Sequence, residues 1–565
     1  MARRKTAKTD DPDIIDVSED ELKSLCQRAK QKDLTDADAD LFEKIVKAYI
    51  YVLKLVRMKN TTVARLRRLF GLKKSEKTDT VLADLEGNSD EGENTSTDTE
   101  AAGSDSGVLS DDKPGKKKKP GHGRNGVNDY SGAERTSVPH ETLERGDPCP
   151  KNCGGKVYPM AKPKSVIRVY GQSPIAAHIC LLERLRCNGC QQIFTAKIPA
   201  QFAGKKKYDA SAAATIALMH YALGTTFYRL EQLQQCQKVP LPAATQWQVI
   251  NDYYPLLLPV FNALVTMAAN GRLLHNDDTT ARILSLMGKR REKKLKAGTF
   301  EKPDRTGLFT TGIVAQSGDR TVALFYSGRD HAGENIAKVL AKRRKELGPP
   351  IQMSDGLASN VCHMFEVLQA NCIPHGRRMW VDQIANFPAE CRYLLETLAK
   401  VFRNEKICKQ QNLTDNQRLL YHQQHSKPLM DELKEWLDGL YRDKKIEPNA
   451  SIADAINYMT KRWDKLTLFL RVPGAPLDNN IVERALKKAI ILRKNSLFYK
   501  TEHGANVGSL FTTLIYNADI NGANPLDYLT QLMRHPDHIA ENPSAWMPWN
   551  YPKQAANIPS PPPVA

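Results

Sequence analysis

The stretch "GRLLHNDDTTARILSL" (Gly271–Leu286) decides the fold, because an apolar run leads directly into two acids. Its length and composition are typical of a buried β-strand that ends in Asp277 and Asp278. Neighbouring residues on a strand point to opposite faces, so only one of the two carboxylates is expected to face a shared site. The sequence leaves open which of them does so.

The segments that follow this strand predict a ribonuclease-H-like core. "TGLFTTGIVAQ" (306–316) and "RTVALFYS" (320–327) are two strands joined by a short turn, hence a hairpin. "HAGENIAKVLAKRRKEL" (331–347) is an amphipathic helix, and "PPIQMSDG" (349–356) is a short strand that delivers Asp355. In this topology the first and fourth strands are neighbours at the centre of the sheet. Asp277 and Asp355 are therefore expected to lie close together.

A third acid stands in "PGAPLDNNIVERALKKAIILRKN" (Pro473–Asn495), where Glu483 heads a helix whose other charges are all positive. A local explanation is a capping box, with Asn480 as the N-cap and Glu483 three residues on. The other explanation is that Glu483 joins the two aspartates. The gap of 483 − 355 = 128 residues is far longer than a crossover needs, so we expect a helical insertion between the two acids.

Three carboxylates in one place repel each other unless a cation neutralises them, and all-oxygen sites suit Mg²⁺ or Mn²⁺. Two such ions about 3.5–4 Å apart can activate the attacking oxygen and stabilise the leaving oxygen of a phosphodiester. A basic frame would hold the DNA backbone. Its candidates on the Glu483 helix are Arg484, Lys487, Lys488 and Arg493.

Length, charge and composition favour a multidomain protein that binds a polyanion. The 565 residues correspond to about three to five domains, and 41% hydrophobic residues support packed cores. The net charge of +18 is typical of nucleic-acid binding, with a basic surface kept for solubility as the alternative. We see no signal peptide and no membrane span, and the 11 scattered cysteines favour a reducing compartment. The expected location is the cytosol.

Two close cysteine pairs predict a structural Zn²⁺ site. "CPKNCGG" supplies Cys149 and Cys153, and "RLRCNGCQQIF" supplies Cys187 and Cys190. Each short loop can wrap one edge of a tetrahedral ion. The alternative is a redox pair or chance spacing, and His178 or Cys180 could replace one ligand.

Two other segments bear on DNA recognition. "VPLPAATQWQVI" (239–250) is typical of a turn leading into a recognition helix, with Thr245, Gln246 and Gln248 expected to be exposed. Near the N-terminus, Leu41, Ile45, Ala48, Val52 and Leu55 form a broken heptad pattern that could mediate dimerisation or pack on the chain's own core.

These segments together resemble the DDE transposases of bacterial insertion sequences, specifically the insertion-sequence-66 type. The similarity is carried by "ARLRRLFGLKKSEK", by the cysteine pairs, by "LHNDDTTARIL" and "MSDGLASN", and by "NCIPHGRRMWVD". The long C-terminal signature beginning "LDNNIVERALKK" also matches. "HNDDTT" differs from the family's commoner form, and the first cysteine spacing is three rather than two.

The resemblance implies a metal-dependent transposase with Asp277, Asp355 and Glu483 as catalytic residues that hold Mg²⁺ or Mn²⁺. It places a Cys–His–Arg–Arg signature on Cys372, His375, Arg377 and Arg378, of which the last three are candidate DNA contacts. The implied partners are element ends and target DNA, a second copy of the chain and small accessory proteins. The alternatives are a DNA-binding regulator without catalysis and a nuclease without strand transfer.

The expected fold is multidomain α+β, a ribonuclease-H-like core with a helical insertion and DNA-binding modules before it. The expected divisions are an N-terminal helical, zipper-like region (1–75), a disordered charged linker (76–135), a zinc module (136–200), a helix-turn-helix region (201–262), the first part of the core (263–380), the helical insertion (381–464), the glutamate helix (465–500) and a C-terminal helical region with a proline-rich tail (501–565).

Overall fold

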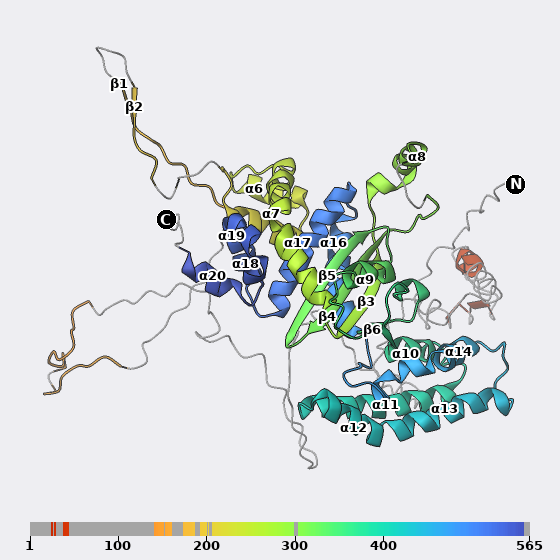
Figure 1. Cartoon of the computed structure of the whole chain (residues 1–565). Coiled ribbons are helices and arrows are strands. Elements are labelled where there is room, and N and C mark those ends of the chain that lie inside the picture. The colour runs from red at the N-terminus through yellow and green to blue at the C-terminus, as the bar shows by residue number, and fades with distance from the viewer. Residues whose placement is uncertain are drawn as a thin grey trace. The chain divides into compact units, whose positions relative to one another are not determined.

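The structure is a computed structural model that describes most of the chain from residue 206 onward and parts of what precedes it (Figure 1). The described residues are 24–25, 28–29, 35, 38–44, 141–151, 153–160, 173–186, 193–199, 202, 206–298 and 303–558. The predicted linker lies outside them, as does the heptad pattern beyond residue 44. Contacts divide the chain into two compact units, Met1–Asp90 with Ile175–Ala565, and Glu91–Pro174.

A five-stranded mixed sheet forms the centre of the larger unit, in the order β5-β4-β3-β6-β7 (Figure 1). β3 pairs with β4 antiparallel and with β6 parallel, so the predicted adjacency of the first and fourth strands is confirmed. The predicted hairpin is β4 and β5. The fifth strand, β7, was not predicted, because four residues are too few to distinguish a strand pattern from chance. The bounds are β3 Leu273–Thr280, β4 Phe309–Ser317, β5 Arg320–Gly328, β6 Ile351–Ser354 and β7 Leu368–Asn371.

Alternate residues of the central strands bury against helices on opposite faces of the sheet, as the pleat requires. On one face, Ile313 and Leu324 share a core with the helices α7 (Ala243–Ala269) and α9 (Ala332–Leu340). On the other face, Val314 and Phe325 pack against α16 (Asn480–Ser496), through Val482 and Leu486 among others. The acid-bearing strand β3 therefore lies inside a three-layer arrangement.

Helix α17 (Glu502–Ile520) covers the free edge of the sheet with side-chain hydrogen bonds. Ser509, Thr513 and Asn517, spaced four residues apart, accept the backbone N–H groups of Ser327, Phe325 and Ala323, each at 3.0 Å. Asn517 also donates to the carbonyl of Ala323 at 2.6 Å. An edge strand whose N–H groups are already paired cannot template another chain.

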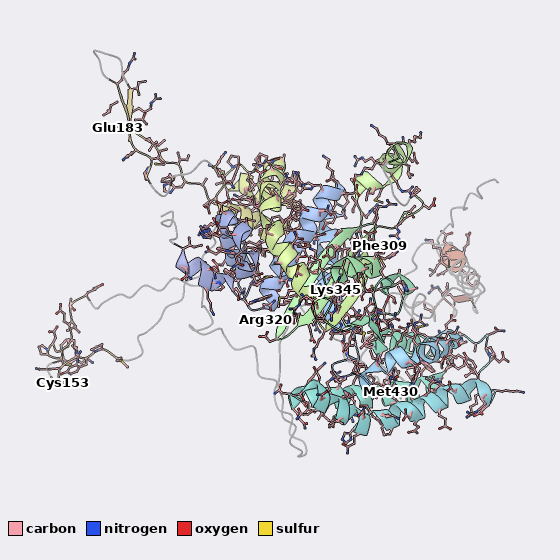
Figure 2. The ribbon with its side chains drawn as sticks, in the orientation of Figure 1. Cys153, Glu183, Phe309, Arg320, Lys345 and Met430 are labelled. Carbon is pink, nitrogen blue, oxygen red and sulfur yellow. The ribbon has the colours of Figure 1, made fainter. Side chains whose placement is uncertain are left out.

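A helical bundle separates β7 from the glutamate helix, where the sequence predicted an insertion. α11, α12 and α13 lie side by side (Figure 1). Met430 is fully buried in this bundle (Figure 2), as is Trp380, and the partly buried Trp436 packs against the same core. The helices are α10 Ile373–Val381, α11 Pro388–Gln410, α12 Asp415–His425, α13 Lys427–Arg442, α14 Ala453–Lys461 and α15 Trp463–Leu466.

One buried carboxylate in this bundle carries a complete set of partners. Glu405 accepts Arg418 Nε at 2.7 Å and lies 3.0 Å from His422 Nε2. Burial alone would raise the pKa of Glu405, but these hydrogen bonds, the charge of Arg418 and that of Lys409 lower it to about 2. Arg418 also donates to the carbonyl of Ala475 at 3.0 Å, which ties the bundle to the segment leading into α16.

Before the sheet, two helices meet at the predicted helix-turn-helix stretch. α6 (Phe227–Cys236) is followed by a short turn and then by α7, whose first residue is Ala243. The expectation that Gln246 is exposed is wrong, since this residue is fully buried. Its Nε2 donates to the carbonyls of Phe227 and Leu241, both at 2.9 Å, and thereby closes the turn.

The remaining elements complete the two ends of the larger unit. They are β1 Arg184–Arg186, β2 Ile193–Thr195, α5 Ala210–Ala217, a π-helical turn at Leu218–Ala222, α8 Gly288–Lys296, α18 Pro525–Arg534, α19 Pro536–Glu541 and α20 Tyr551–Asn557, with short 3₁₀ turns at Leu284–Leu286, Ala358–Asn360, Leu468–Leu470 and Pro543–Trp546. Among the helices described, none is long and apolar enough to cross a membrane.

Candidate active site

The three acids singled out in the sequence come from three elements and act on one another. Asp277 lies within β3, Asp355 follows the last residue of β6, and Glu483 lies in α16. Burial raises the pKa of Asp277 to about 7, and the charges of Asp355 and Glu483 add to the rise. In the parallel register His275 stands beside Met353, so Asp277 and Asp355, two residues further on, lie at the same level of adjacent strands.

Asp278 faces away from this group and caps a helix instead. Its Oδ2 accepts the backbone N–H of Ala332, at the start of α9, at 2.9 Å and lies 3.2 Å from His331 Nδ1. Its Oδ1 accepts the hydroxyl of Thr311 at 2.6 Å. A carboxylate at a helix N-terminus is a common stabilising arrangement. The alternative left open by the sequence is thus decided in favour of Asp277 as the member of the cluster.

Asp355 is held in place by an Asx turn. Its Oδ1 accepts the backbone N–H of Leu357 and the side-chain amide of Asn360, both at 3.0 Å. The hydroxyl of Tyr458, on α14, donates to the backbone carbonyl of Asp355 at 2.6 Å. The helical bundle therefore contributes directly to the position of this carboxylate.

Glu483 is not part of a capping box. The helix begins at Asn480 with Asn479 in the N-cap position, and that side chain makes no capping hydrogen bond. Glu483 is thus the fourth residue of the helix, one position too late for the box. Its Oε1 lies 3.8 Å from Nδ1 of His375, on α10. The local explanation offered by the sequence is wrong.

Asn479 locks the start of α16 onto the strand that carries Asp277. This side chain is fully buried; its Oδ1 lies 3.0 Å from Nδ1 of His275, and its Nδ2 donates to the carbonyl of Asn276 at 3.0 Å. Its backbone N–H points to the sulfur of Cys372 at 3.3 Å. Sequence analysis did not identify Asn479, because nothing in "LDNN" indicates a partner some 200 residues away. The available signal was an amide directly before a helix start.

Gly312 lets α16 approach the sheet at the level of Asp277. In the antiparallel register Gly312 stands opposite Asp277. A Cβ at this glycine would lie 3.0 Å from Leu486 and 3.1 Å from Val482. These two residues flank Glu483 on the helix, so the missing side chain permits the close packing that brings Glu483 toward Asp277.

The oxygen-rich part of this site suits a hard divalent cation such as Mg²⁺ or Mn²⁺. Ligand atoms of Cys372, His375 and Glu483 lie within 4.8 Å of one another, whereas Asp277, Asp355 and Glu483 do not form such a group among the described residues. Cys372 is fully buried, and burial raises the pKa of its thiol to about 12. It therefore stays a protonated thiol that accepts the N–H of Asn479, so the donors that fit a metal are the carboxylates.

The basic residues predicted to contact DNA occupy different environments. Arg484, Lys487 and Arg378 are exposed, whereas His375 and Arg377 are half-buried. Lys488 is half-buried and lies 4.0 Å from Asp519. Nη1 of Arg493 donates to Thr279 Oγ1 at 3.0 Å and Thr280 Oγ1 at 2.6 Å, so this arginine braces α16 against the end of β3.

Of the four predicted zinc ligands, two are described and lie on one hairpin of the smaller unit. Cys149 donates its N–H to the carbonyl of Gly155 at 2.8 Å. Hydrogen bonds to the sulfur of Cys153 lower the pKa of its thiol. The larger effect comes from the backbone N–H of Gly155, the smaller from the side chain of Cys149. Two adjacent sulfurs, one of them favoured as thiolate, suit Zn²⁺. Cys187 and Cys190 lie outside the described residues.

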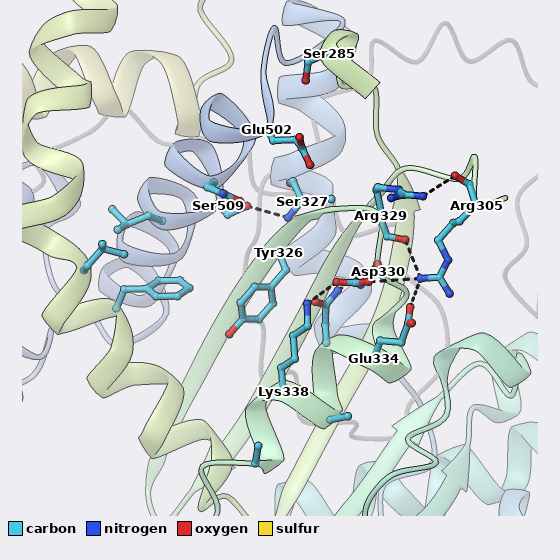
Figure 3. A pocket seen from close by; sticks show the side chains of 18 of the residues that line it. Ser285, Arg305, Tyr326, Ser327, Arg329, Asp330, Glu334, Lys338, Glu502 and Ser509 are labelled. Carbon is cyan, nitrogen blue, oxygen red and sulfur yellow. Dashed lines mark hydrogen bonds and ion pairs between the residues drawn. The ribbon is translucent and has the colours of Figure 1, made fainter. Parts of the chain in front are cut away.

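A cavity of about 1370 Å³ lies between α7, α8, α9 and α17 (Figure 3). It carries many cations, but acids pair several of them: Arg305 with Glu334 and Asp330, Lys338 with Asp330, and Lys294 with Glu502. None of the three clustered carboxylates lines it. This cavity is therefore separate from the candidate active site.

Comparison with known proteins identifies the family of this chain. The family described as Transposase IS66 family matches residues 205–507, which include all three acids. Two proteins of Sinorhizobium fredii (strain NBRC 101917 / NGR234), both named as uncharacterized, are also similar. The protein y4hP is 24% identical, over 66% of this chain and 68% of its own length. The protein y4jD is 25% identical, over 65% of this chain and 71% of its own length.

The family match spans more than half of the chain and contains the sheet, the bundle and the glutamate helix. A transposase family implies DNA binding and a divalent metal. The chain belongs to the IS66 family of transposases.

Proposed function

We propose that this chain is a DDE-type DNA transposase that cleaves the ends of an insertion sequence and joins them to target DNA. The observation that carries the proposal is the strand register, which places Asp277 and Asp355 on adjacent parallel strands, with the Glu483 helix packed on Gly312 opposite Asp277. A carboxyl group whose pKa is raised, as burial raises that of Asp277, is typical of a functional site. The strand order, with β3 and β6 adjacent, supports a ribonuclease-H-like core.

Asp277, Asp355 and Glu483 would hold the divalent ions. When bound, a pair of such ions supplies an activated attacking oxygen and stabilises the leaving oxygen of the phosphodiester. Asp277 must give up its proton to serve as a ligand, and the ions' charge favours that loss. Arg484 and Lys487, exposed on α16, would hold the DNA backbone beside Glu483.

His375 would act between the cluster and the DNA. Its Nδ1 is buried and has no hydrogen-bond partner, and it lies 3.8 Å from Glu483. The ring is thus placed to orient the glutamate or a scissile phosphate. Arg377 and Arg378 on the same helix would contact the neighbouring backbone. After cleavage, the freed 3′-OH would attack a target phosphodiester in line, so that one P–O bond forms as another breaks.

The modules before the sheet would recognise the element ends. We assign this role to the N-terminal helical region (1–75), the zinc module (136–200) and the helix-turn-helix region (201–262), connected by the linker (76–135). The core (263–380 and 465–500), the insertion (381–464) and the C-terminal region (501–565) would form the catalytic body. Pairing of two ends requires at least a dimer, and accessory proteins of the element are expected partners at the bacterial nucleoid.

The direct test combines purified protein, a labelled duplex carrying an end of the element, Mg²⁺ and a plasmid target. We expect end cleavage and covalent joining of the labelled strand to the plasmid. Cleavage without joining of a pre-cut 3′-OH end would favour a nuclease. Binding without cleavage or joining would favour a DNA-binding regulator.

A further inference from the structure

A second cavity, of about 650 Å³, lies where the helices before the sheet meet the catalytic core. Its walls are the π-helical turn, the starts of α6 and α7, the end of β3 and the second half of α16. Pockets for organic ligands typically measure about 300–1,000 Å³. Because the three carboxylates lie elsewhere, this cavity requires an explanation of its own.

The cavity borders the candidate active site along two elements. Thr280 in its lining stands 280 − 277 = 3 residues beyond Asp277 on β3, which corresponds to about 10 Å. Arg493 stands 493 − 483 = 10 residues beyond Glu483 on α16, which corresponds to about 15 Å. One strand of DNA advances about 3.4 Å per nucleotide. The cavity is therefore about three to four nucleotides away from the carboxylates.

Aromatic rings form one side of the cavity. Phe227 and His220 are stacked with ring centroids 3.9 Å apart and planes inclined by 16°. Trp247, at the start of α7, is half-buried and also belongs to the lining. His220 is buried, and burial lowers its pKa to about 4, so the ring is neutral. Its Nδ1 donates to the carbonyl of Thr225 at 2.8 Å, which leaves Nε2 as an acceptor.

Three energetically unfavourable local features line the same cavity. Ser496 Oγ is buried without a hydrogen-bond partner. Leu497 has φ +65° and ψ −39°, and the N–H of Phe498 donates to the carbonyl of Ser496 at 2.8 Å. This is a classic γ-turn, which is rare and strained. The π-helical turn Leu218–Ala222 lies on the other side. Strained backbone, π-turns and unpaired buried groups concentrate at functional sites.

The rim of the cavity is positively charged. Arg282 and Lys500 are exposed on the two segments that pair through the bridge Ile283–Tyr499. With Arg493 they place three cations, and no acid, among the lining residues. An apolar, aromatic interior with a cationic rim matches a nucleotide, whose base is flat and whose phosphate is anionic.

We propose that this cavity receives one unstacked base of the DNA end, about three to four nucleotides from the scissile phosphate. This inference rests on the proposed function. The base stacks on the Phe227–His220 pair and Trp247, and its polar edge meets His220 Nε2 and Ser496 Oγ. Arg282 and Lys500 contact the flanking phosphates. Extrusion of a base at this point would hold the end in register with the carboxylates.

The first test places 2-aminopurine, in turn, at each of the first six positions of a duplex element end. With Ca²⁺ in place of Mg²⁺, we expect one position to change its fluorescence several-fold on binding, since that base leaves its neighbours in the duplex for the side chains of the cavity. Phe227→Ala should abolish that change. Tyr228→Ala is the matched control, because this neighbouring aromatic is 63% exposed and does not line the cavity.

The second test compares the cleavage rates of a fully paired DNA end and of an end with one mismatched base pair. Phe227→Ala should slow Mg²⁺-dependent cleavage of a paired end about tenfold or more, the loss expected for one base–aromatic stack. A mismatch at the responding position should restore the rate to within about threefold. Ala244→Phe is a second variant, for use if Phe227→Ala folds poorly. It narrows the cavity from an exposed position, and we expect it to slow cleavage as Phe227→Ala does.

The outcomes separate the two proposals. Absence of cleavage by the wild-type chain would overturn the proposed function. Normal wild-type cleavage with no responding position, or with no rescue by a mismatch, would overturn the base pocket alone. Cleavage left unchanged by both cavity variants would likewise overturn it.

Discussion

Asn479 determines how precisely the glutamate helix is placed. Its amide joins the ring of His275 and the carbonyl of Asn276, both on the strand that carries Asp277. Two of the three clustered acids are therefore connected through one buried side chain. Removing it would leave both partners buried and unpaired, which costs more than the hydrogen bonds themselves contribute.

We therefore predict that Asn479→Ala lowers the free energy of unfolding by about 2–4 kcal/mol. It should also slow end cleavage by about 100-fold, because a shift near 1 Å in a reacting group is enough for that loss. Asn480→Ala, next to it but exposed, is the control and should change neither quantity appreciably. Urea denaturation and single-turnover cleavage measure the two effects. Equal behaviour of the two variants would contradict this role.

Asp277 should make metal binding depend on pH. Its pKa in the folded protein is about 7, above the ordinary value of 3.8. Between these values the folded chain keeps a proton that the unfolded chain has lost, so stability without metal falls as pH rises and levels off above about 7. Metal competes with that proton. Mn²⁺ affinity should fall about tenfold per pH unit below pH 7 and be constant above it, as measured by calorimetry. A flat profile in wild type, or an unchanged slope in Asp277→Asn, would contradict the shift.

At the residue scale, the sequence indicated the acids but not their orientations. The Asp277–Asp278 pair was correctly expected to split between two faces, because strand geometry alone requires it. Which acid faced the cluster depended on Thr311 and Ala332, whose proximity arises only from strand pairing and helix packing. The capping explanation for Glu483 was wrong because the helix begins one residue earlier than predicted, with Asn479 as the N-cap. The exact start of a helix depends on tertiary contacts.

Among the elements, α17 deserves a direct test because it replaces a neighbouring strand. Ser509, Thr513 and Asn517 pair with every second N–H of β5. The sequence "GSLFTTLIYNADI" contains this spacing, yet a helical pattern does not reveal that its polar residues face a strand edge. The hairpin β4–β5 could be predicted, since its strands and turn are contiguous. β7 could not, because its pairing with β6 is non-local.

We predict that Thr513→Val destabilises the protein by about 1–3 kcal/mol, because the buried N–H of Phe325 loses its acceptor. Thr512→Val is the control, because it makes the same change at a residue that is 5% exposed, compared with 0% for Thr513. The hydrogen bond to Phe325 of β5 comes from Thr513 and not from Thr512. This control should change stability by less than about 0.5 kcal/mol. Thermal unfolding followed by circular dichroism gives both values. A larger loss in the control would contradict the edge-pairing role.

For the whole molecule, the cysteine pairs predict one Zn²⁺ per chain. Cys149 and Cys153 already lie together on their hairpin, with the Cys153 thiolate favoured. Metal analysis of the purified chain should give one equivalent of zinc, and Cys153→Ser should lose most of it. Cys236→Ser, which removes another exposed cysteine, should retain it. Zinc loss should weaken end binding more than cleavage of DNA already bound. Full zinc content in Cys153→Ser would contradict the assignment.

The central claim is that Asp277, Asp355 and Glu483 act as one metal-dependent DNA-cleaving site. The most direct measurement is the rate of end cleavage by Glu483→Gln over a range of Mg²⁺ concentrations, with end binding measured in parallel. We predict binding close to that of wild type and cleavage reduced by about a thousandfold or more, because charge stabilisation at the reacting oxygens is lost. Cleavage at the wild-type rate would show that Glu483 is a structural residue and would end the account.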